Sequence, residues 1–238
     1  MATIPSPHTF RGGIHPAYNK ALAAAAPIRE LPLPARLTVP MLQHLGAPAK
    51  PVVKAGETVA GGQLVAEAAG FISAPVHAPA AGKVVAIEET LTASGRACAA
   101  VVIETAPEQV WQPLPTFPEW RFTDAKQLIE HIGAAGVVGM GGAGFPTRVK
   151  LSPPSDKPID TVILNGAECE PYLTSDHRMM LEHAAEIRIG AEIIRHILGA
   201  RSLRIAIEDN KPDAIAAMEK AFQDTDGDVA VTVATDAP

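Results

Sequence analysis

The interpretation of this chain starts from Gly136-Val137-Val138-Gly139-Met140-Gly141-Gly142-Ala143-Gly144-Phe145-Pro146-Thr147-Arg148-Val149-Lys150. Five of its first nine residues are glycines, and glycine tolerates positive φ and lets a ligand approach the backbone where a Cβ would clash. Successive backbone N–H groups in such a turn form a concave site for anionic oxygens, and the lysine at its end adds a positive charge. The stretch therefore predicts a phosphate-binding loop. The alternative is a glycine-rich turn that only serves packing.

The ligand of this loop is predicted to be a mononucleotide such as FMN. Gly139, Gly141 and Gly144 match the dinucleotide pattern G-x-G-x-x-G, but that pattern alone is weak. Pro146 delays any helix by one residue. At the end of the next strand, where the dinucleotide pattern has an acid, the chain has Asn165. FMN therefore fits better than NAD bound in the standard way.

Composition and charge limit the class of protein. The 238 residues are 47% hydrophobic and 19% charged, which indicates a globular chain. The formal net charge of −6 gives no basis for nucleic-acid binding. No run of about 18 apolar residues is present, so no membrane-spanning helix is predicted and a cytoplasmic location is expected. Cys98 and Cys169 are too few for a thiolate zinc or iron–sulfur site, and Cys169 is expected to serve packing.

Four regions follow from the distribution of prolines, glycines and apolar residues. Residues 1–35 carry six prolines and are expected to form an extended arm. Residues 36–106 contain short apolar segments separated by Gly and Pro, which favour a small β sandwich or barrel. Residues 107–122 form a proline-rich linker that Trp111 and Trp120 are expected to fix to a surface. The remainder, 123–238, is predicted to be an α/β domain.

The β region resembles the biotinyl/lipoyl-carrier family, whose fold is a barrel-sandwich hybrid. The resemblance rests on residues 53–65 followed by 78–84. Its turns at 54–57 and 60–63 are expected to close hairpins. Carriers present a lysine at a hairpin tip, but the corresponding residues 67–73 contain none. Acylation or biotinylation is therefore not expected, and the domain is interpreted as a docking domain.

Strands and helices alternate in the last region, as expected for right-handed crossovers and a parallel sheet. Thr123 or Asp124 is the expected cap of its first helix. The predicted elements are strands at 161–164, 203–207 and 229–233, with helices from about 175 to 198 and from Pro212 onward. The first strand is continuously apolar, which is typical of burial on both faces. Ligands bind at the carboxyl ends of such strands, where Asn165 lies.

Residues 165–176 provide the second part of the predicted site. Asn165 offers both a donor and an acceptor for the edge of a flavin or base. Glu168 and Glu170 stand two residues apart in a loop, are expected to share a face, and are candidates for contacts with ribose or flavin. The alternative is that both are solvated loop acids. Three histidines, His15, His44 and His77, show no metal-ligand spacing, so no metal site is predicted.

Several motifs together resemble the C subunit of the Rnf electron-transport complex. These motifs occur in order along almost the whole chain: residues 12–16, 43–48, 139–151, 165–176 and 207–212. The glycine loop and the Asn-x-x-Glu-x-Glu-Pro stretch are also similar to the flavin-bearing, NADH-oxidising subunit of respiratory complex I. The fold that this implies is a barrel-sandwich hybrid domain followed by a Rossmann-like α/β domain for FMN and NADH.

The resemblance also implies roles for single residues. FMN phosphate would be held by Gly139, Gly141, Gly142, Gly144 and Lys150. The flavin would contact Asn165 and Glu168, and NAD(H) would face Phe145 and Glu170. Met140 and Ala167 stand where the complex I subunit usually has Arg and Asp, so two polar flavin contacts are absent. No catalytic side chain is expected, because the redox chemistry belongs to the flavin.

The implied function is electron input to a membrane-bound, ion-translocating ferredoxin:NAD+ oxidoreductase. The expected partners are the other subunits of that complex and NAD(H), with ferredoxin acting indirectly. Relatives carry [4Fe–4S] clusters in segments beyond the position of Pro238, so the chain is expected to be a truncated form that lacks them. The expected location is peripheral, on the cytoplasmic face of the inner membrane. Two alternatives remain: a non-catalytic docking fragment, and a related flavin-dependent corrinoid reductase.

Overall fold

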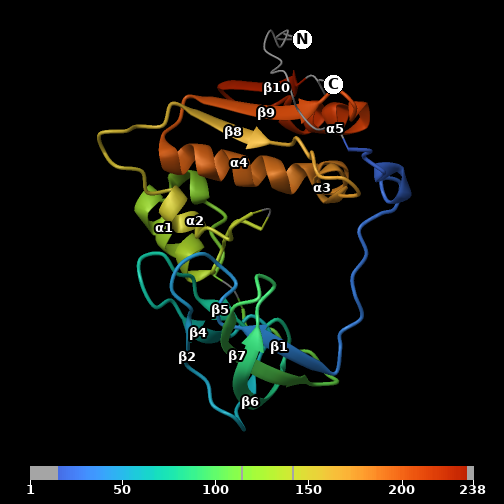
Figure 1. The fold of residues 1–238 in the computed structure, drawn as a ribbon. Helices are drawn as coiled ribbons and strands as arrows, with labels where there is room; N and C mark the ends of the chain where they lie inside the picture. Colours follow the sequence, from blue (N-terminus) through green and yellow to red (C-terminus); the bar gives the residue numbers. More distant parts are fainter. Residues whose placement is uncertain (1–15, 114, 141, 235–238) are drawn as a thin grey trace. The chain divides into compact units, whose positions relative to one another are not determined.

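The computed structural model describes residues 16–113, 115–140 and 142–234, which form two compact units (Figure 1). Residues 31–156 make up the first, called the hybrid unit below, and residues 157–234 together with 16–30 make up the second, called the α/β unit. Each is described by itself. The expected linker at 107–122 falls inside the hybrid unit, as do residues 123–156. The domain bounds expected from the sequence stay predictions.

The hybrid unit contains two antiparallel sheets. The larger has the order β1-β7-β6-β3 and the smaller the order β2-β4-β5. Their bounds are β1 (Arg36–Pro40), β2 (Lys50–Pro51), β3 (Thr58–Val59), β4 (Leu64–Glu67), β5 (Val76–His77), β6 (Gly82–Leu91) and β7 (Ala97–Thr105). A core of small aliphatic side chains, including the buried Val59, Val65, Val84 and Ile103, joins strands of both sheets. Because β2, β3 and β5 have only two residues each and bury little surface by themselves, they depend on this shared core.

The expectation that two turns close hairpins is wrong. The turn at 54–57 leads from β2 to β3, and the turn at 60–63 leads from β3 to β4. β3 pairs with β6, whereas β2 and β4 pair with each other, so both turns carry the chain between sheets. The local chemistry is as expected, since Gly56 and Gly62 have φ of 97° and 77°. Turn residues specify a reversal of the chain but not which strand the next segment joins.

The segment after β7 is attached to the hybrid unit. Trp111 covers Gly61, because a Cβ at that glycine would lie 2.8 Å from the indole. The indole of Trp120 has the guanidinium of Arg121 4.3 Å from its centre. A short 3-10 turn, η2 (Trp120–Phe122), precedes α1 (Ala125–Ala134) and α2 (Thr147–Lys150). Asp124 caps α1 by accepting a hydrogen bond from the N–H of Lys126 at 2.9 Å, as expected.

The α/β unit contains a parallel sheet of three strands in the order β10-β9-β8. The strands are β8 (Thr161–Asn165), β9 (Ser202–Glu208) and β10 (Asp228–Ala234), and the helices are α3 (Ser175–Glu182), α4 (Ala184–Leu198) and α5 (Pro212–Phe222). Figure 1 shows α4 along the sheet. Fully buried Leu203, Ile205 and Ile207 of β9 pack against apolar side chains of all three helices. The 3-10 turn η1 (Lys20–Leu22) belongs to this unit.

Two expectations for this unit are wrong. The helix expected from about 175 to 198 is broken at His183, whose φ of −131° lies outside the helical region, and α3 and α4 result. β8 was expected to be buried on both faces, but it is an edge strand, and Ile163 is 65% exposed. An apolar run shows that a segment is β-forming and does not show how many of its faces are covered.

Candidate functional site

The glycine loop lies in the hybrid unit and is closed at its base. The N–H of Gly139 donates to the carbonyl of Phe145 at 3.0 Å, and the N–H of Thr147 donates to the carbonyl of Val137 at 3.0 Å. These two bonds bring the two ends of the stretch together just before the four-residue helix α2. Gly141, one of the predicted phosphate-binding residues, lies outside the described residues.

Two glycines of this loop have open space or only the end of a flexible side chain at the Cβ position. A Cβ built on Gly139 would lie 3.1 Å from Nζ of Lys150, so the absent side chain makes room beside the ammonium. A Cβ on Gly142 would meet nothing within 4 Å. A phosphate is a suitable ligand for a lysine ammonium beside exposed backbone N–H groups. The loop thus places the predicted Gly139 beside the predicted Lys150, and phosphate binding by this loop stays a prediction.

Gly144 has a different role, because it packs against the hybrid sheets. Its φ is 63°, and a Cβ there would lie 2.9 Å from Cα of His44. The N–H of Leu45 donates to the carbonyl of Gly144 at 3.0 Å. The phosphate-loop and packing-turn interpretations therefore apply to different glycines of one stretch.

The ring of His44 contacts the backbone on both sides, at Ala74 and at Leu45. Its Nε2 accepts from the N–H of Ala74 at 3.2 Å, so the ring hydrogen is on Nδ1, 3.1 Å from the carbonyl of Leu45. Burial lowers the pKa of His77, which lines a cavity of about 170 Å³ together with His44. Both nitrogens of His44 contact the backbone, so this ring is a structural element rather than a metal ligand. Among the described residues, no group of three His, Cys, Asp or Glu side chains is placed to hold a metal ion.

Arg148 of α2 contacts the hairpin tip at 67–73, where carrier domains present a lysine. Its guanidinium donates to the carbonyl of Phe71 at 2.8 Å and to that of Gly70 at 3.4 Å. The same guanidinium lies 5.7 Å from the centre of the Phe71 ring. The tip and the helix that carries Lys150 are thus joined within the hybrid unit.

The second group of predicted residues follows β8 in the α/β unit. Asn165 is exposed, and its Oδ1 accepts from the N–H of Ala167 at 3.1 Å. Glu168 is 2% exposed, whereas Cys169 and Glu170 are exposed. The expectations that the two glutamates share a face and that Cys169 serves packing are therefore wrong. Side chains alternate between two faces with a fixed period only in regular strands and helices. In a loop, a spacing of two residues does not predict that two side chains point to the same side.

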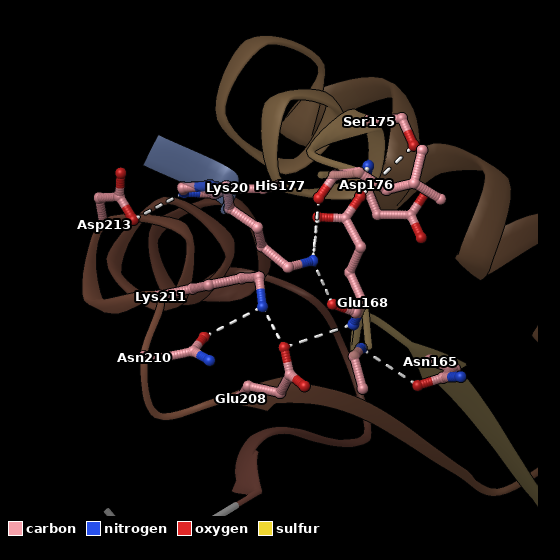
Figure 2. A network of polar contacts seen from close by, with 12 residues as sticks. Lys20, Asn165, Glu168, Ser175, Asp176, His177, Glu208, Asn210, Lys211 and Asp213 are labelled. Atoms are coloured by element: carbon pink, nitrogen blue, oxygen red, sulfur yellow. Dashed lines mark hydrogen bonds and ion pairs between the residues drawn. The ribbon is translucent and has the colours of Figure 1, made fainter. Parts of the chain in front are cut away.

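Figure 2 shows how the carboxylate of Glu168 is held. Its Oε1 accepts from the N–H of Asp176 at 2.7 Å and lies 3.4 Å from Oγ of Ser175, and its Oε2 is 3.4 Å from Nζ of Lys20. The carboxylate satisfies N-terminal donors of α3, as a side-chain cap does. Glu168 is therefore engaged inside the α/β unit, and its contact with flavin stays a prediction.

A second buried ion pair lies next to the first. The ammonium of Lys211 contacts Oε2 of Glu208, and it donates to Oδ1 of Asn210 at 3.0 Å. The same Oε2 lies 3.4 Å from the N–H of Glu168, which links the two networks (Figure 2). Both Lys211 and Glu208 are buried. Loss of one member of such a pair leaves the other charge buried without a partner, which strongly destabilises the fold.

Asp176 has a raised pKa in these surroundings. Partial burial is the largest cause, followed by the negative charges of Glu168 and Glu170, while Lys20 and Lys211 act in the opposite direction. Repulsion between neighbouring carboxylates favours the protonated form of one of them. The carboxyl end of β8 is thus an acidic site that two lysines partly neutralise.

An open hollow of about 370 Å³ adjoins this acidic end. Asn165 and Asp176 provide polar atoms, and most of the lining is apolar, with Ile163, Met179 and Met180 among its members. An apolar hollow with a few polar groups is the usual form of a site for a flat heterocycle.

Comparison with known proteins shows what this chain is related to. A family model described as the RnfC barrel sandwich hybrid domain matches residues 8–108, and one described as the Nuo51 FMN-binding domain matches residues 132–237. The chain is 46% identical over 218 residues to the C subunit of the proton-translocating ferredoxin:NAD(+) oxidoreductase complex of Clostridium ljungdahlii. It is 45% identical over 215 residues to the C subunit of the Na(+)-translocating complex of Acetobacterium woodii. Over about nine-tenths of its own length the chain is thus homologous to these C subunits.

These relatives are longer than the chain. The matches cover 91% and 90% of this chain and 48% of each relative, so the chain spans about half of their length. Among solved structures, a NAD+-reducing [NiFe]-hydrogenase is 22% identical with a TM-score of 0.37, covering 47% of this chain and 20% of the other. In the part of the chain that the structure describes, no helix is both long and apolar enough to cross a bilayer.

The two family models confirm the barrel-sandwich hybrid and FMN-binding domains, but they leave the site residues untested. Sequence reasoning missed Lys20 and Lys211, which neutralise the strand-end carboxylates. Lys211 had a detectable signal, because it lies three residues after Glu208 at the end of a strand. Lys20 had none, because it is 148 residues from Glu168.

Proposed function

We propose that the chain is the FMN- and NAD(H)-binding part of the electron-input subunit of an ion-translocating ferredoxin:NAD+ oxidoreductase. The observation that carries the proposal is the Lys150 ammonium beside the vacant Cβ position of Gly139, within the region that matches an FMN-binding domain. The relatives named as the C subunit of such complexes support the choice of complex. FMN, when bound, supplies the redox chemistry by exchanging hydride with NAD(H) and single electrons with the next carrier.

In this proposal, the residues of the chain bind FMN and NAD(H) and orient them relative to each other. The glycine loop with Gly139, Gly141, Gly142 and Gly144 and the ammonium of Lys150 hold the phosphate. Because the N–H of Gly139 donates to Phe145, this glycine contributes the room beside the ammonium, and Gly144 contributes the packing of the loop. The Oδ1 of Asn165 already accepts from Ala167, so its side-chain N–H groups are the donors that it offers to flavin. Phe145 and Glu170 face NAD(H), and the exposure of Glu170 is compatible with that role.

One family match covers both groups of predicted residues. The region that matches the FMN-binding domain, residues 132–237, includes the glycine loop of the hybrid unit and the strand-end residues of the α/β unit. We assign this region a Rossmann-like fold, of which the three parallel strands are a part. The protein would lie at the cytoplasmic face of the membrane, bound to other subunits and exchanging electrons with ferredoxin through them.

A flavin titration tests this function. FMN is added to the chain, quenching of its fluorescence is followed, and NADH is added last. Loss of one charge-assisted hydrogen bond costs about 1.5–3 kcal/mol, so Lys150→Ala should weaken FMN binding roughly 10- to 150-fold. Lys126→Ala, at an exposed position on α1, is the matched control and should bind as the unchanged protein does. No saturable binding by the chain would contradict the proposal and leave a docking module as the better interpretation.

A further inference from the structure

The loop at 168–173 closes around the ammonium of Lys20. The Nζ of this lysine donates to the carbonyl of Glu168 and, at 2.9 Å, to the carbonyl of Leu173, the two ends of the loop. The third oxygen, Oε2 of Glu168, is 3.4 Å away. A lysine ammonium has three N–H donors, so the three oxygens account for all of them (Figure 2). The ammonium of Lys20 is thus surrounded by oxygens of the loop at 168–173 and neutralises part of their negative charge.

A second contact shows that the segment around Lys20 and the loop fold together. The N–H of Tyr172 donates to the carbonyl of Tyr18 at 2.7 Å. Tyr172 has φ of 67°, in the left-handed region, which costs a residue with a side chain about 1–2 kcal/mol. Such a conformation persists only where surrounding contacts impose it. The segment at 18–20 is therefore part of the loop's structure.

The ammonium also balances the charge of the loop. Glu168 is buried, and the negative charges of Glu168 and Glu170 both raise the pKa of Asp176. Without Lys20, the buried carboxylate of Glu168 would keep its donors on α3 but lose its neighbouring cation. An uncompensated buried charge is costly, so the loop would be expected to rearrange until Glu168 reaches water.

We propose that Lys20 is a positioning residue, whose ammonium sets the shape of the loop at 168–173 and thereby the placement of Glu170 toward the nicotinamide. The role of Glu170 rests on the proposed function, whereas the effect of Lys20 on the loop does not. In this role Lys20 acts through the loop that its ammonium contacts. The side chain is 15% exposed, so a small amine can reach its place from solvent.

Amide hydrogen exchange with chemical rescue tests this proposal without a flavin. In Lys20→Ala, the amides of Tyr172 and Asp176 should exchange at least about tenfold faster, because a charge-assisted hydrogen bond is lost. Butylammonium at millimolar concentration should restore the protection, whereas butanol should not. Lys220→Ala, exposed on α5, is the matched control and should leave both amides unchanged. Unchanged exchange in Lys20→Ala, or rescue by butanol as well as by the amine, would overturn the proposal.

The effect on nicotinamide is measured separately in flavin-loaded protein. Lys20→Ala should raise the Kd for NADH about tenfold and leave the Kd for FMN within about twofold, since Lys150 and the glycine loop are unchanged. Lys20→Arg retains the charge but not a compact ammonium, so it should fold and still weaken NADH binding. Wild-type affinity for NADH in both variants would refute the role of Lys20. Failure of the unchanged protein to bind FMN would instead refute the proposed function, and the exchange experiment would still decide the role of Lys20.

Discussion

Substituting the glycines of the loop one at a time separates its binding role from its packing role. Gly139→Ala is the decisive change, because its Cβ would lie 3.1 Å from Nζ of Lys150 and 3.8 Å from the nearest atom of Phe145. Only the flexible end of the lysine must move, and the φ of Gly139 is not in the left-handed region. The fold should therefore accept the alanine, but the ammonium is pushed from the position where the phosphate would bind.

The magnitudes follow from these distances. An alanine in place of glycine at a compatible position stabilises a protein by about 0.4–1 kcal/mol, because it lowers the conformational entropy of the unfolded chain. Displacement of the lysine side chain offsets part of this gain in the free energy of unfolding. Loss of one charge-assisted hydrogen bond costs about 1.5–3 kcal/mol, which is roughly a 10- to 150-fold increase in the Kd for FMN. Gly139→Ala should thus leave the free energy of unfolding within about 1 kcal/mol of the unchanged protein while it weakens FMN binding as Lys150→Ala does.

Two neighbouring glycines provide the controls for urea unfolding and FMN titration. Gly142→Ala meets no protein atom within 4 Å and should leave the free energy of unfolding little changed. Gly144→Ala would place a Cβ 2.9 Å from Cα of His44 at φ of 63° and should lower the free energy of unfolding by about 1–3 kcal/mol. FMN binding by Gly139→Ala that equals that of the unchanged protein would refute the placement of the phosphate beside Lys150.

Three further changes test other parts of the structure. Because the pKa of Asp176 is raised above 3.8, its charge destabilises the fold at neutral pH. Asp176→Asn should therefore stabilise the protein by about 0.5 kcal/mol at pH 7, and this gain should shrink as pH falls and vanish only well below pH 3.8. Equal gains at pH 7 and at pH 3.8 in urea unfolding would contradict this. Gly61→Ala should shift the fluorescence maximum of Trp111, since its Cβ would lie 2.8 Å from the indole, and an unchanged spectrum would show that the contact is absent. Arg148→Ala should speed proteolysis at the hairpin tip 67–73, because the donors to Phe71 and Gly70 are lost, whereas cleavage at the unchanged rate would show that the tip is held by other contacts.

Local patterns predicted the features that depend on short stretches of sequence. The loop at 136–150 was predicted because glycine spacing limits where side chains can be, and the structure shows room beside Lys150 at Gly139. The strands predicted from apolar runs at 161–164 and 203–207 are present as β8 and β9, and Asp124, one of two residues predicted as the cap from its type, caps α1. In each case the cause lies within a few residues of the effect.

Features that depend on distant partners were not predictable in this way. The burial of Glu168 is set by Lys20 and by the start of α3, and no local pattern indicates that a residue 148 positions away supplies a cation. The break between α3 and α4 falls at His183, where neither glycine nor proline marks the end of a helix. The two turns at 54–57 and 60–63 contain the right residues, but the partner strands are chosen by the shared core. Long-range packing decides all three.

The hydrogen bonds between Arg148 and the hairpin tip bear on whether this domain could act as a biotin or lipoate carrier. A carrier domain depends on a tip that enzymes can surround, because ligases attach a prosthetic group there and other enzymes must then reach it. In this chain, the carbonyls of Gly70 and Phe71 are held by a side chain of α2, next to the glycine loop. Writing a lysine at position 71 would therefore give a poor acceptor for biotin or lipoate, although Phe71 is 69% exposed. For this domain to act as a carrier, Arg148 would first have to release the carbonyls of Gly70 and Phe71.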